Sequence, residues 1–280
     1  MIEIQNVTKK YGNYTALNNL NFKIEKGEIV GFLGPNGAGK STTMNIITGY
    51  ISATQGTVKV DGLDILENPK EVKKKIGYLP EIPPVYMDMT VEEYLDFVAK
   101  IKGVSSKERE EHISKVVKLT KVEKVRKRLI KNLSKGYRQR VGLAQAIMGD
   151  PEILILDEPT VGLDPKQIID MRNLIKEIGK SHTVLLSSHI LSEVSAVCSR
   201  IVIINKGHIV ASGTPEELSK MLSYSDKLLI RVKADEKAAG KVISELDNVK
   251  SYSSEGSHEK GTFDFVIESE KDKDIRETVF

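Results

Sequence analysis

The stretch that decides the fold of this chain is Gly34-Pro35-Asn36-Gly37-Ala38-Gly39-Lys40-Ser41. It has the spacing G-x-x-x-x-G-K-S, which is typical of a loop that binds phosphate groups. The apolar, β-branched residues 29–33 precede it and predict a buried strand, whereas residues 42–47 predict a helix. Glycines let backbone N–H groups turn towards a phosphate, and the helix that follows adds its positive end. The motif therefore predicts a nucleotide site in which Lys40 contacts the β- and γ-phosphates and Ser41 binds Mg²⁺.

The composition predicts one large folded core and a small additional unit. The chain has 280 residues, of which 40% are hydrophobic and 29% are charged, which is enough to bury an α/β core. A formal net charge of +3 does not indicate a nucleic-acid-binding protein, and the single cysteine, Cys198, excludes an intramolecular disulfide. No apolar run reaches the ~18 to 20 residues that span a bilayer, and the N-terminus has no signal-peptide pattern. A role at a membrane would therefore depend on docking to another chain.

A second group of candidate residues follows the apolar run at residues 153–156, which predicts a fully buried parallel strand. The run ends in Asp157 and Glu158, at the edge of a parallel sheet where the phosphate loop is also expected. Asp157 is expected to hold Mg²⁺ through water, and Glu158 to polarise a water molecule in line with the γ-phosphate. In the alternative interpretation the two carboxylates only cap the turn before Pro159.

Between these two sites lies the segment Leu133-Ser134-Lys135-Gly136-Tyr137-Arg138-Gln139-Arg140. Ser134 is a suitable N-cap for a helix whose apolar face lies within residues 141–147. By itself this pattern predicts a capped amphipathic helix. A serine and a glycine at the start of a helix also form an anion site, so the segment is a candidate for a second phosphate contact.

In their order along the chain, these motifs resemble those of the ATP-binding subunits of ABC transporters, over roughly residues 1–218. Residues 34–41 match the Walker A loop, and residues 133–139 match the ABC signature, which is specific to this family among P-loop proteins. Residues 157–158 match the Walker B aspartate and the catalytic carboxylate, and residues 162–164 match the D-loop. The resemblance implies an α/β fold: a P-loop NTPase with an ABC ATPase core, an antiparallel β subdomain and a helical subdomain.

The resemblance also implies the cofactors, ATP and Mg²⁺, and the residues that bind them. Tyr11 matches the aromatic residue that stacks on adenine. Catalytic roles are expected for Lys40, Glu158 and His189, and metal binding for Ser41, Glu81 and Asp157. Contacts with the nucleotide are expected for Tyr11, Gly34, Pro35, Asn36, Gly37, Ala38, Gly39, Lys40, Ser41, Thr42, Ser134, Gly136 and Asp164.

His189 has two interpretations. In isolation, a packed histidine beside the end of a strand is the simpler one. However, His189 follows a strand predicted at residues 183–187, which is expected to lie beside the Walker B strand. A histidine at that position can bond to the γ-phosphate and help to hold the attacking water, as the family's switch histidine does.

The signature departs from the usual LSGGQ of the family at two positions. Lys135 replaces a glycine and Tyr137 replaces the glutamine, whereas Ser134 and Gly136, which make the phosphate contact in the family, are retained. Forms of the LSKGxRQR type occur in the drug-export and ABC-2-like branch. The departure therefore favours that branch without removing the phosphate contact.

A third departure lies after the strand predicted at residues 76–80, where the family has a glutamine and this chain has Glu81. That residue normally touches Mg²⁺ and relays the state of the nucleotide to the membrane subunit. A carboxylate can still bind Mg²⁺, but it adds a negative charge beside Asp157 and Glu158. Hydrolysis is expected, whereas the sequence does not predict the effect of Glu81 on its rate or on its coupling to transport.

Two partners follow from the resemblance. Two copies are expected to pack head to tail, so that Ser134 and Gly136 of one copy close on the ATP held by Lys40 of the other. ATP hydrolysis would then power a membrane exporter of the ABC-2 or drug-export branch, including the gliding-motility-associated type. The second partner is a separately encoded polytopic membrane subunit, no nucleic acid is expected, and the chain is placed in the cytoplasm, peripheral on the cytoplasmic face of the cell membrane.

Two other classes remain as alternatives. A soluble ABC ATPase that acts on nucleic acid or ribosomes usually has long coiled coils or two cassettes in one chain, and this chain has neither heptads nor a second phosphate loop. A P-loop kinase would not need the signature helix. The neighbouring open reading frame would discriminate between the transporter and the soluble ATPase.

The chain is expected to divide into two domains. Residues 1–220 would form the ABC ATPase domain, with the helical subdomain at about residues 90–150. Within that subdomain, Thr90 and Ser105 begin capping-box patterns that predict the starts of helices. After the D-loop, Asp164 followed by Pro165 predicts the capped start of another helix. Residues 225–280 are expected to form a small α+β accessory domain, truncated inside its last helix.

Shorter patterns predict the strands and turns around these parts. Alternating residues at 2–7, 20–24 and 56–62 predict an antiparallel subsheet. In the C-terminal part, strands are expected at residues 227–233, 249–253 and 262–268, a helix at 235–246 and a charged loop at 254–261.

Overall fold

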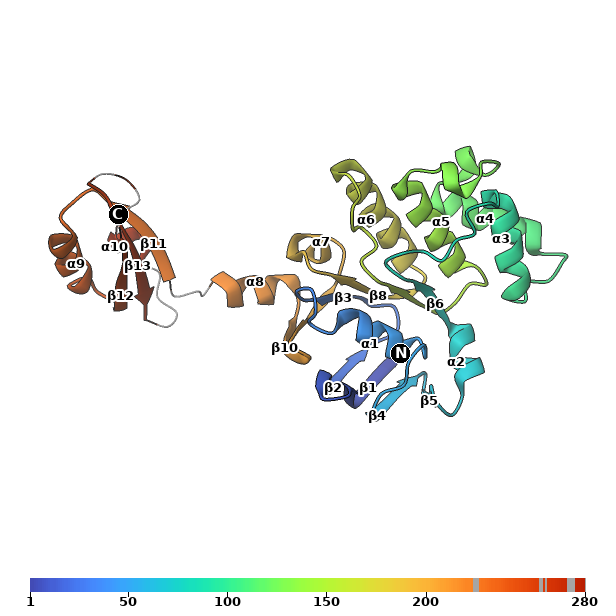
Figure 1. The fold of residues 1–280 in the computed structure, drawn as a ribbon, viewed down its shortest axis with the longest axis horizontal. Helices are drawn as coiled ribbons and strands as arrows, with labels where there is room; N and C mark the ends of the chain where they lie inside the picture. Colours follow the sequence, from blue (N-terminus) through green and yellow to red (C-terminus); the bar gives the residue numbers. More distant parts are fainter. Residues whose placement is uncertain (224–226, 257–258, 260, 271–274, 280) are drawn as a thin grey trace. The chain divides into compact units, whose positions relative to one another are not determined.

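The computed structural model describes residues 1–223, 227–256, 259, 261–270 and 275–279, and only the backbone of residues 220–223, 227 and 277. The chain divides into two compact units, Met1–Pro215 and Glu216–Phe280 (Figure 1). Within the described part of the chain, no helix is both long enough and apolar enough to cross a membrane.

A six-stranded sheet forms the centre of the first unit. Its strands are arranged in the order β10-β9-β3-β8-β7-β6; only β10 runs antiparallel to its neighbour. This order places the strand before the phosphate loop, β3, next to β8, and β8 next to the Walker B strand, β7. The bounds are β3 (Ile29–Leu33), β6 (Ile76–Leu79), β7 (Ile153–Leu156), β8 (Thr183–Ser188), β9 (Arg200–Asn205) and β10 (His208–Gly213).

Helices cover both faces of this sheet (Figure 1). Helix α1 lies on one face, and α6 and α7 lie on the other. The fit against α7 is close, because a Cβ atom added at Gly31 of β3 would lie 2.9 Å from Val194 Cβ and 3.1 Å from Cys198 Sγ. The bounds are α1 (Lys40–Ile47), α2 (Pro69–Lys75), α6 (Pro165–Gly179) and α7 (Leu191–Ser195). Helix α8 (Pro215–Ser223) begins at the last residue of this unit and otherwise belongs to the second unit.

The predicted antiparallel subsheet is present, with the strand order β2-β1-β4-β5. Its strands β1 (Ile2–Tyr11) and β2 (Tyr14–Ile24) are longer than predicted, and they continue through β4 (Gln55–Val60) and β5 (Leu63–Asp64). Helix α1 lies between the two sheets, because Met44, Ile46 and Ile47 share one buried core with residues of β1, β2, β3 and β7. The phosphate loop is therefore held from both sides by apolar packing.

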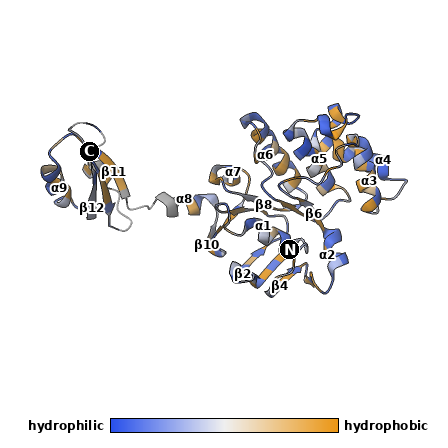
Figure 2. Cartoon of the chain, in the orientation of Figure 1, coloured by the Kyte–Doolittle hydropathy of each residue, from blue (hydrophilic) through white to orange (hydrophobic). Residues whose placement is uncertain are grey.

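The helical part of this unit contains α3 (Val91–Ile101), α4 (Arg109–Thr120) and α5 (Lys135–Ile147), with short 3₁₀ turns η1 (Glu123–Val125) and η2 (Ile130–Asn132). These helices carry both hydrophobic and hydrophilic residues (Figure 2). Thr90 caps α3 in a complete capping box with Glu93, as predicted. The prediction of a helix start at Ser105 was wrong: Ser105 and Glu108 bond to each other in a separate turn, and α4 begins at Arg109.

The second unit has a three-stranded antiparallel sheet, in the order β11-β13-β12, and a small core formed with α9. Asp235 caps α9, as the predicted helix start requires. Strand β12 runs to Gly256, so part of the predicted charged loop is a strand; residues 257–258, 260 and 271–274 lie outside the described residues. The bounds are β11 (Lys227–Val232), α9 (Glu236–Ser244), β12 (Val249–Gly256), β13 (Phe263–Ser269) and α10 (Arg276–Val279).

Candidate active site

The phosphate loop connects β3 to α1 and depends on glycines that no larger residue could replace. Gly39, which precedes α1, has a φ angle of +110°, and a Cβ atom there would lie 2.5 Å from Leu17 Cδ2. A Cβ atom at Gly34 would lie 2.3 Å from the carbonyl oxygen of Ile204. The loop is thus fitted against β2 and β9, so its N–H groups are fixed at the start of α1.

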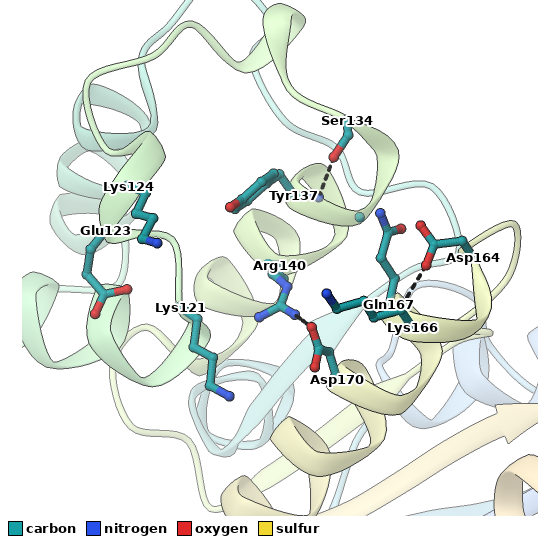
Figure 3. Close-up of a pocket in the computed structure, with 11 residues that line it drawn as sticks. Lys121, Glu123, Lys124, Ser134, Tyr137, Arg140, Asp164, Lys166, Gln167 and Asp170 are labelled. Carbon is teal, nitrogen blue, oxygen red and sulfur yellow. Dashed lines mark hydrogen bonds and ion pairs between the residues drawn. The ribbon is translucent and has the colours of Figure 1, made fainter.

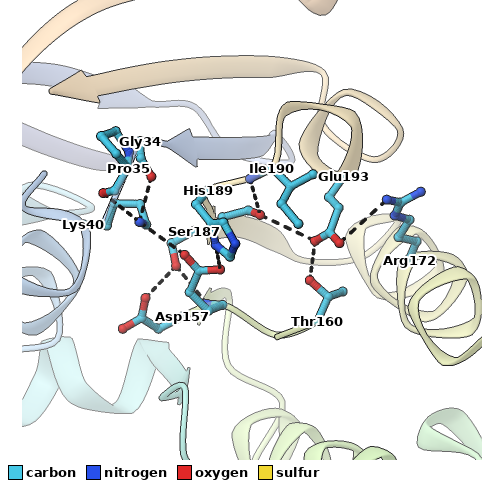
Figure 4. Close-up of polar contacts among 12 residues, drawn as sticks. Gly34, Pro35, Lys40, Asp157, Thr160, Arg172, Ser187, His189, Ile190 and Glu193 are labelled. Carbon is cyan, nitrogen blue, oxygen red and sulfur yellow. Dashed lines mark hydrogen bonds and ion pairs between the residues drawn. The ribbon is translucent and has the colours of Figure 1, made fainter. Parts of the chain in front are cut away.

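Lys40 is buried at the base of this loop. Its Nζ donates hydrogen bonds to the carbonyl oxygens of Gly34, at 2.8 Å, and Pro35, at 3.2 Å. The side chain of Lys40 is therefore bonded to the first two residues of the loop, as Figure 4 shows. The ammonium group is held at the start of α1, where the helix end already favours an anion.

The two Walker B carboxylates follow β7, as predicted, and are buried. Asp157 is 3% exposed, and Ser187 Oγ donates to its Oδ1 at 2.5 Å. Glu158 has a φ angle of +47°, which is unusual for a residue with a Cβ atom. Its N–H donates to Ser187 Oγ at 2.8 Å, so one serine of the adjacent strand β8 holds both residues.

Glu158 contacts both of the other predicted catalytic residues. Its Oε1 is 3.2 Å from Lys40 Nζ, and its Oε2 is 3.0 Å from His189 Nδ1. Oε1 is buried and, among the described residues, accepts no hydrogen bond with good geometry. Oε1 thus lies beside the Lys40 ammonium without a formal hydrogen bond, and it could accept a proton from a bound water once Lys40 turns to a phosphate.

The predicted nucleotide residues surround a cavity of about 290 Å³ next to this cluster. Eight residues that were predicted to bind nucleotide or metal line it: Tyr11, Asn36, Gly37, Gly39, Lys40, Ser41, Thr42 and Glu81. The predicted loop residues Gly34, Pro35 and Ala38 are not part of the lining. The lining also contains Tyr14 and Ala16, which the motifs did not indicate. Tyr14 pairs with Tyr11 across the β1–β2 hairpin. Lys9 Nζ lies 5.1 Å from the centre of the Tyr11 ring and bonds to the carbonyl oxygen of Ser52, so it supports that ring.

The predicted metal ligands provide oxygen atoms of the kind that Mg²⁺ prefers. Ser41 and Glu81 line the cavity, whereas Asp157 is not part of its lining. The Glu81 carbonyl oxygen accepts a bond of 3.0 Å from Gln139 Nε2 of α5, which connects this position to the signature helix. Burial, together with the negative charge of Asp157, raises the pKa of the Tyr78 phenol well above its usual value. Ser41 and Glu81 thus offer oxygen donors that suit Mg²⁺, and among the described residues no three His, Cys, Asp or Glu side chains are grouped closely enough to hold a metal ion on their own.

The signature residues lie elsewhere on the unit. Ser134 caps α5 by accepting a bond of 3.4 Å from the N–H of Tyr137, as predicted. Ser134, Gly136 and Asp164 line a separate hollow of about 470 Å³ (Figure 3). Within one chain, the structure therefore does not bring these three residues to the phosphate loop.

The unusual signature residue Lys135 is placed against the D-loop. A Cβ atom at Gly162, whose φ angle is +68°, would lie 2.2 Å from Lys135 Nζ. Gly136 is similarly close to the start of α6, because a Cβ atom there would lie 2.6 Å from Gln167 Oε1. The signature and the D-loop therefore form one surface, and the α6 helix that follows is capped by Asp164 as predicted.

Comparisons with known proteins agree with this arrangement. The ABC transporter family matches residues 17–161. The bacitracin transport ATP-binding protein BcrA of Bacillus licheniformis is 38% identical over 222 residues, which are 79% of this chain and 72% of that protein. The lantibiotic transport ATP-binding protein SrtF of Streptococcus pyogenes is 39% identical over 211 residues, which are 75% of this chain and 89% of that protein.

A solved structure shares the fold and shows a nucleotide-bound state. The dimeric post-hydrolysis structure of the ATP-binding cassette MJ0796, bound to ADP and Pi, aligns with a TM-score of 0.70 and 29% identity. The alignment covers 77% of this chain and 99% of that one. The chain therefore belongs to the ABC transporter family, as one of its ATP-binding chains that hydrolyse ATP.

Proposed function

We propose that this chain powers a membrane exporter by hydrolysing ATP between two copies of itself. The observation that carries the proposal is that the two groups of residues expected to contact phosphate line separate cavities of one chain. The phosphate loop with Lys40 and Glu158 is one, and Ser134 with Gly136 is the other. A head-to-tail pair would place the second group of one copy over the first group of its partner, which completes two equivalent sites.

Each residue of the site has a distinct role in this proposal. Glu158 accepts a proton from the attacking water through its buried Oε1, while His189 orients the carboxylate and reaches the γ-phosphate. Lys40 exchanges its bonds to the loop carbonyls for bonds to the β- and γ-phosphates. Mg²⁺, when bound by Ser41, Glu81 and, through water, Asp157, would neutralise charge on the phosphate oxygens.

The remaining nucleotide contacts follow from the lining of the cavity. Tyr11 would stack on adenine with its free face, since Lys9 covers the other. The N–H groups between Gly34 and Thr42 would surround the phosphates, together with the side chains of Asn36 and Ser41. On the partner copy, Ser134, Gly136 and Asp164 would approach the γ-phosphate.

The choice of an exporter rests on the relatives, whose printed names include bacitracin and lantibiotic transport. In this proposal the membrane partner is a separately encoded polytopic subunit, and the chain works at the cytoplasmic face of the membrane without nucleic acid. Coexpression with the polytopic protein encoded next to it should move the chain from the soluble to the membrane fraction. Cosedimentation with ribosomes or DNA, unaffected by coexpression, would instead support the soluble class.

Replacing Glu81 by glutamine should raise the Mg²⁺ concentration that supports half-maximal ATP hydrolysis. The change removes a negative charge from the cavity, and a unit charge ~4 Å from a divalent cation in water is worth about 2 kcal/mol, or roughly 30-fold in affinity. ATP affinity without metal should hardly change, because Tyr11 and the loop are untouched. Metal titrations of hydrolysis and of binding of a fluorescent ATP analogue would measure both effects.

Glu67→Gln is the matched control, since Glu67 is exposed and is not part of the cavity lining. It removes the same charge from the chain, and its Mg²⁺ titration should superimpose on that of the unaltered protein. If the Glu81→Gln titration superimposes as well, Glu81 is not a metal ligand, and its role is limited to coupling.

A further inference from the structure

Glu193 is a buried acid with no role in the site as described so far. It lies in the short helix α7 and is 7% exposed. A buried carboxylate is costly unless it is paired and hydrogen-bonded. The apolar contact of α7 with β3 is made by its neighbour Val194, which is fully buried and lies against Gly31. The partners of Glu193 therefore indicate its purpose.

These partners come from three separate segments around the active site (Figure 4). Thr160, two residues after Glu158, donates a short hydrogen bond to Glu193 Oε2. Ser188, which precedes His189, donates to the same oxygen at 3.5 Å. Arg172 of α6 lies 4.0 Å from Oε1 as an ion pair.

These contacts connect the chain segment that follows Glu158 to the segment that carries His189. Ser188 Oγ also accepts a bond of 3.1 Å from the N–H of Ile190, so both neighbours of His189 are fixed. One oxygen of Glu193 thereby holds the segment after Glu158 and the segment that carries His189. The distance of 3.0 Å between His189 Nδ1 and Glu158 Oε2 depends on the relative position of these two segments.

We infer that Glu193 is a positioning residue, which sets the alignment of His189 and Glu158 through Thr160 and Ser188. The inference rests on the proposed catalytic role of that pair. Glu158 has a strained backbone, with a φ angle of +47°, and such a conformation persists only where its surroundings fix it. Ser187 fixes the N–H of Glu158 itself, and Glu193 fixes the chain two residues later, at Thr160.

Thr160→Val and Glu193→Leu test this inference. Each removes the hydrogen bond between Thr160 and Glu193 and keeps a similar side-chain volume. Since a displacement of about 1 Å in a catalytic group can cost 10²-fold, each kcat should fall at least ~10-fold. KM for ATP and the affinity for a fluorescent ATP analogue should stay within about twofold, since the phosphate loop is not touched. The double variant should be no slower than the slower single variant, because both changes remove the same bond.

Two controls separate positioning from general stability. Thr160→Ser retains the hydroxyl group and should recover most of kcat. Thr120→Val removes another buried hydroxyl, which bonds within α4, and should lower Tm about as much as Thr160→Val without changing kcat. Kinetics and thermal unfolding of the intact chain would be compared for all variants.

The inference is wrong if Thr160→Val and Glu193→Leu keep kcat within about twofold. It is equally wrong if kcat falls only together with ATP affinity and Tm, and Thr160→Ser restores none of them, because the network is then only structural. Glu158→Gln distinguishes this failure from a failure of the proposed function. If Glu158→Gln is inactive and Thr160→Val is active, only the positioning role of Glu193 is refuted. If Glu158→Gln is active, the catalytic role of Glu158 and the positioning role of Glu193 are both refuted.

Discussion

Replacing Glu158 by glutamine should reduce ATP turnover by at least ~10²-fold, the usual contribution of a general base. The amide keeps the shape of the side chain but cannot accept the proton of the attacking water. ATP affinity should be retained, because Lys40 and the loop are unchanged. Since the bound ATP is no longer hydrolysed, an ATP-bound dimer should accumulate. Gel filtration with and without Mg-ATP, beside a phosphate-release assay, would measure both effects.

Glu152→Gln is the control for this experiment. Glu152 precedes the same strand β7 at its opposite end, where it pairs with Lys75 on the surface. Its replacement should leave turnover and dimerisation unchanged. A Glu158→Gln variant that hydrolyses ATP near the unaltered rate would remove Glu158 from its assigned role.

Replacing Ser134 by arginine should abolish both dimerisation and hydrolysis while ATP binding by the single chain is retained. Ser134 is exposed and lies outside the nucleotide cavity of its own chain. A bulky cation at the start of α5 would block the close approach of the partner's γ-phosphate. Equilibrium binding of a fluorescent ATP analogue, gel filtration and phosphate release would separate the three properties.

Ser105→Arg is the control for the arginine substitution. Ser105 is also exposed and also accepts a bond of 3.4 Å from the N–H three residues later. It has the same local geometry as Ser134 but lies in the turn before α4, away from the signature hollow. Its replacement should leave dimerisation and hydrolysis intact; if it does not, the effect at Ser134 is not specific.

Sequence patterns predicted the helix starts of the first unit well where the capping hydrogen bonds join residues that are close in the sequence. The strand Ile29–Leu33, the capping box at Thr90 and the caps at Ser134 and Asp164 were all confirmed. The helix start at Ser105 was wrong because a capping-box pattern is also satisfied by a single turn. The lengths of β1 and β2 could not be predicted, because pairing across the sheet extends them beyond their apolar residues.

The residues of the candidate site also fall into two groups, those that belong to a sequence motif and those that only the fold brings to the site. Residues within a motif, such as Lys40 and Asp157, could be named because their spacing carries the chemistry. Tyr14 was missed, since only the register of the hairpin brings it beside Tyr11. Glu193 was missed as well, because its main partner, Thr160, is 33 residues away and the sequence around it has no pattern of its own.

The most direct test of the account is to mix two inactive variants, Ser134→Arg and Lys40→Ala. A mixed dimer unites the intact Lys40 of one copy with the intact Ser134 of the other, so one of its two sites is complete. Because neither variant forms an active dimer with itself, only mixed dimers hydrolyse ATP, and with one complete site of two the rate should recover to at most about half of the unaltered rate. A mixture that is no more active than either variant alone would contradict the claim that each ATP is hydrolysed between two copies of this chain.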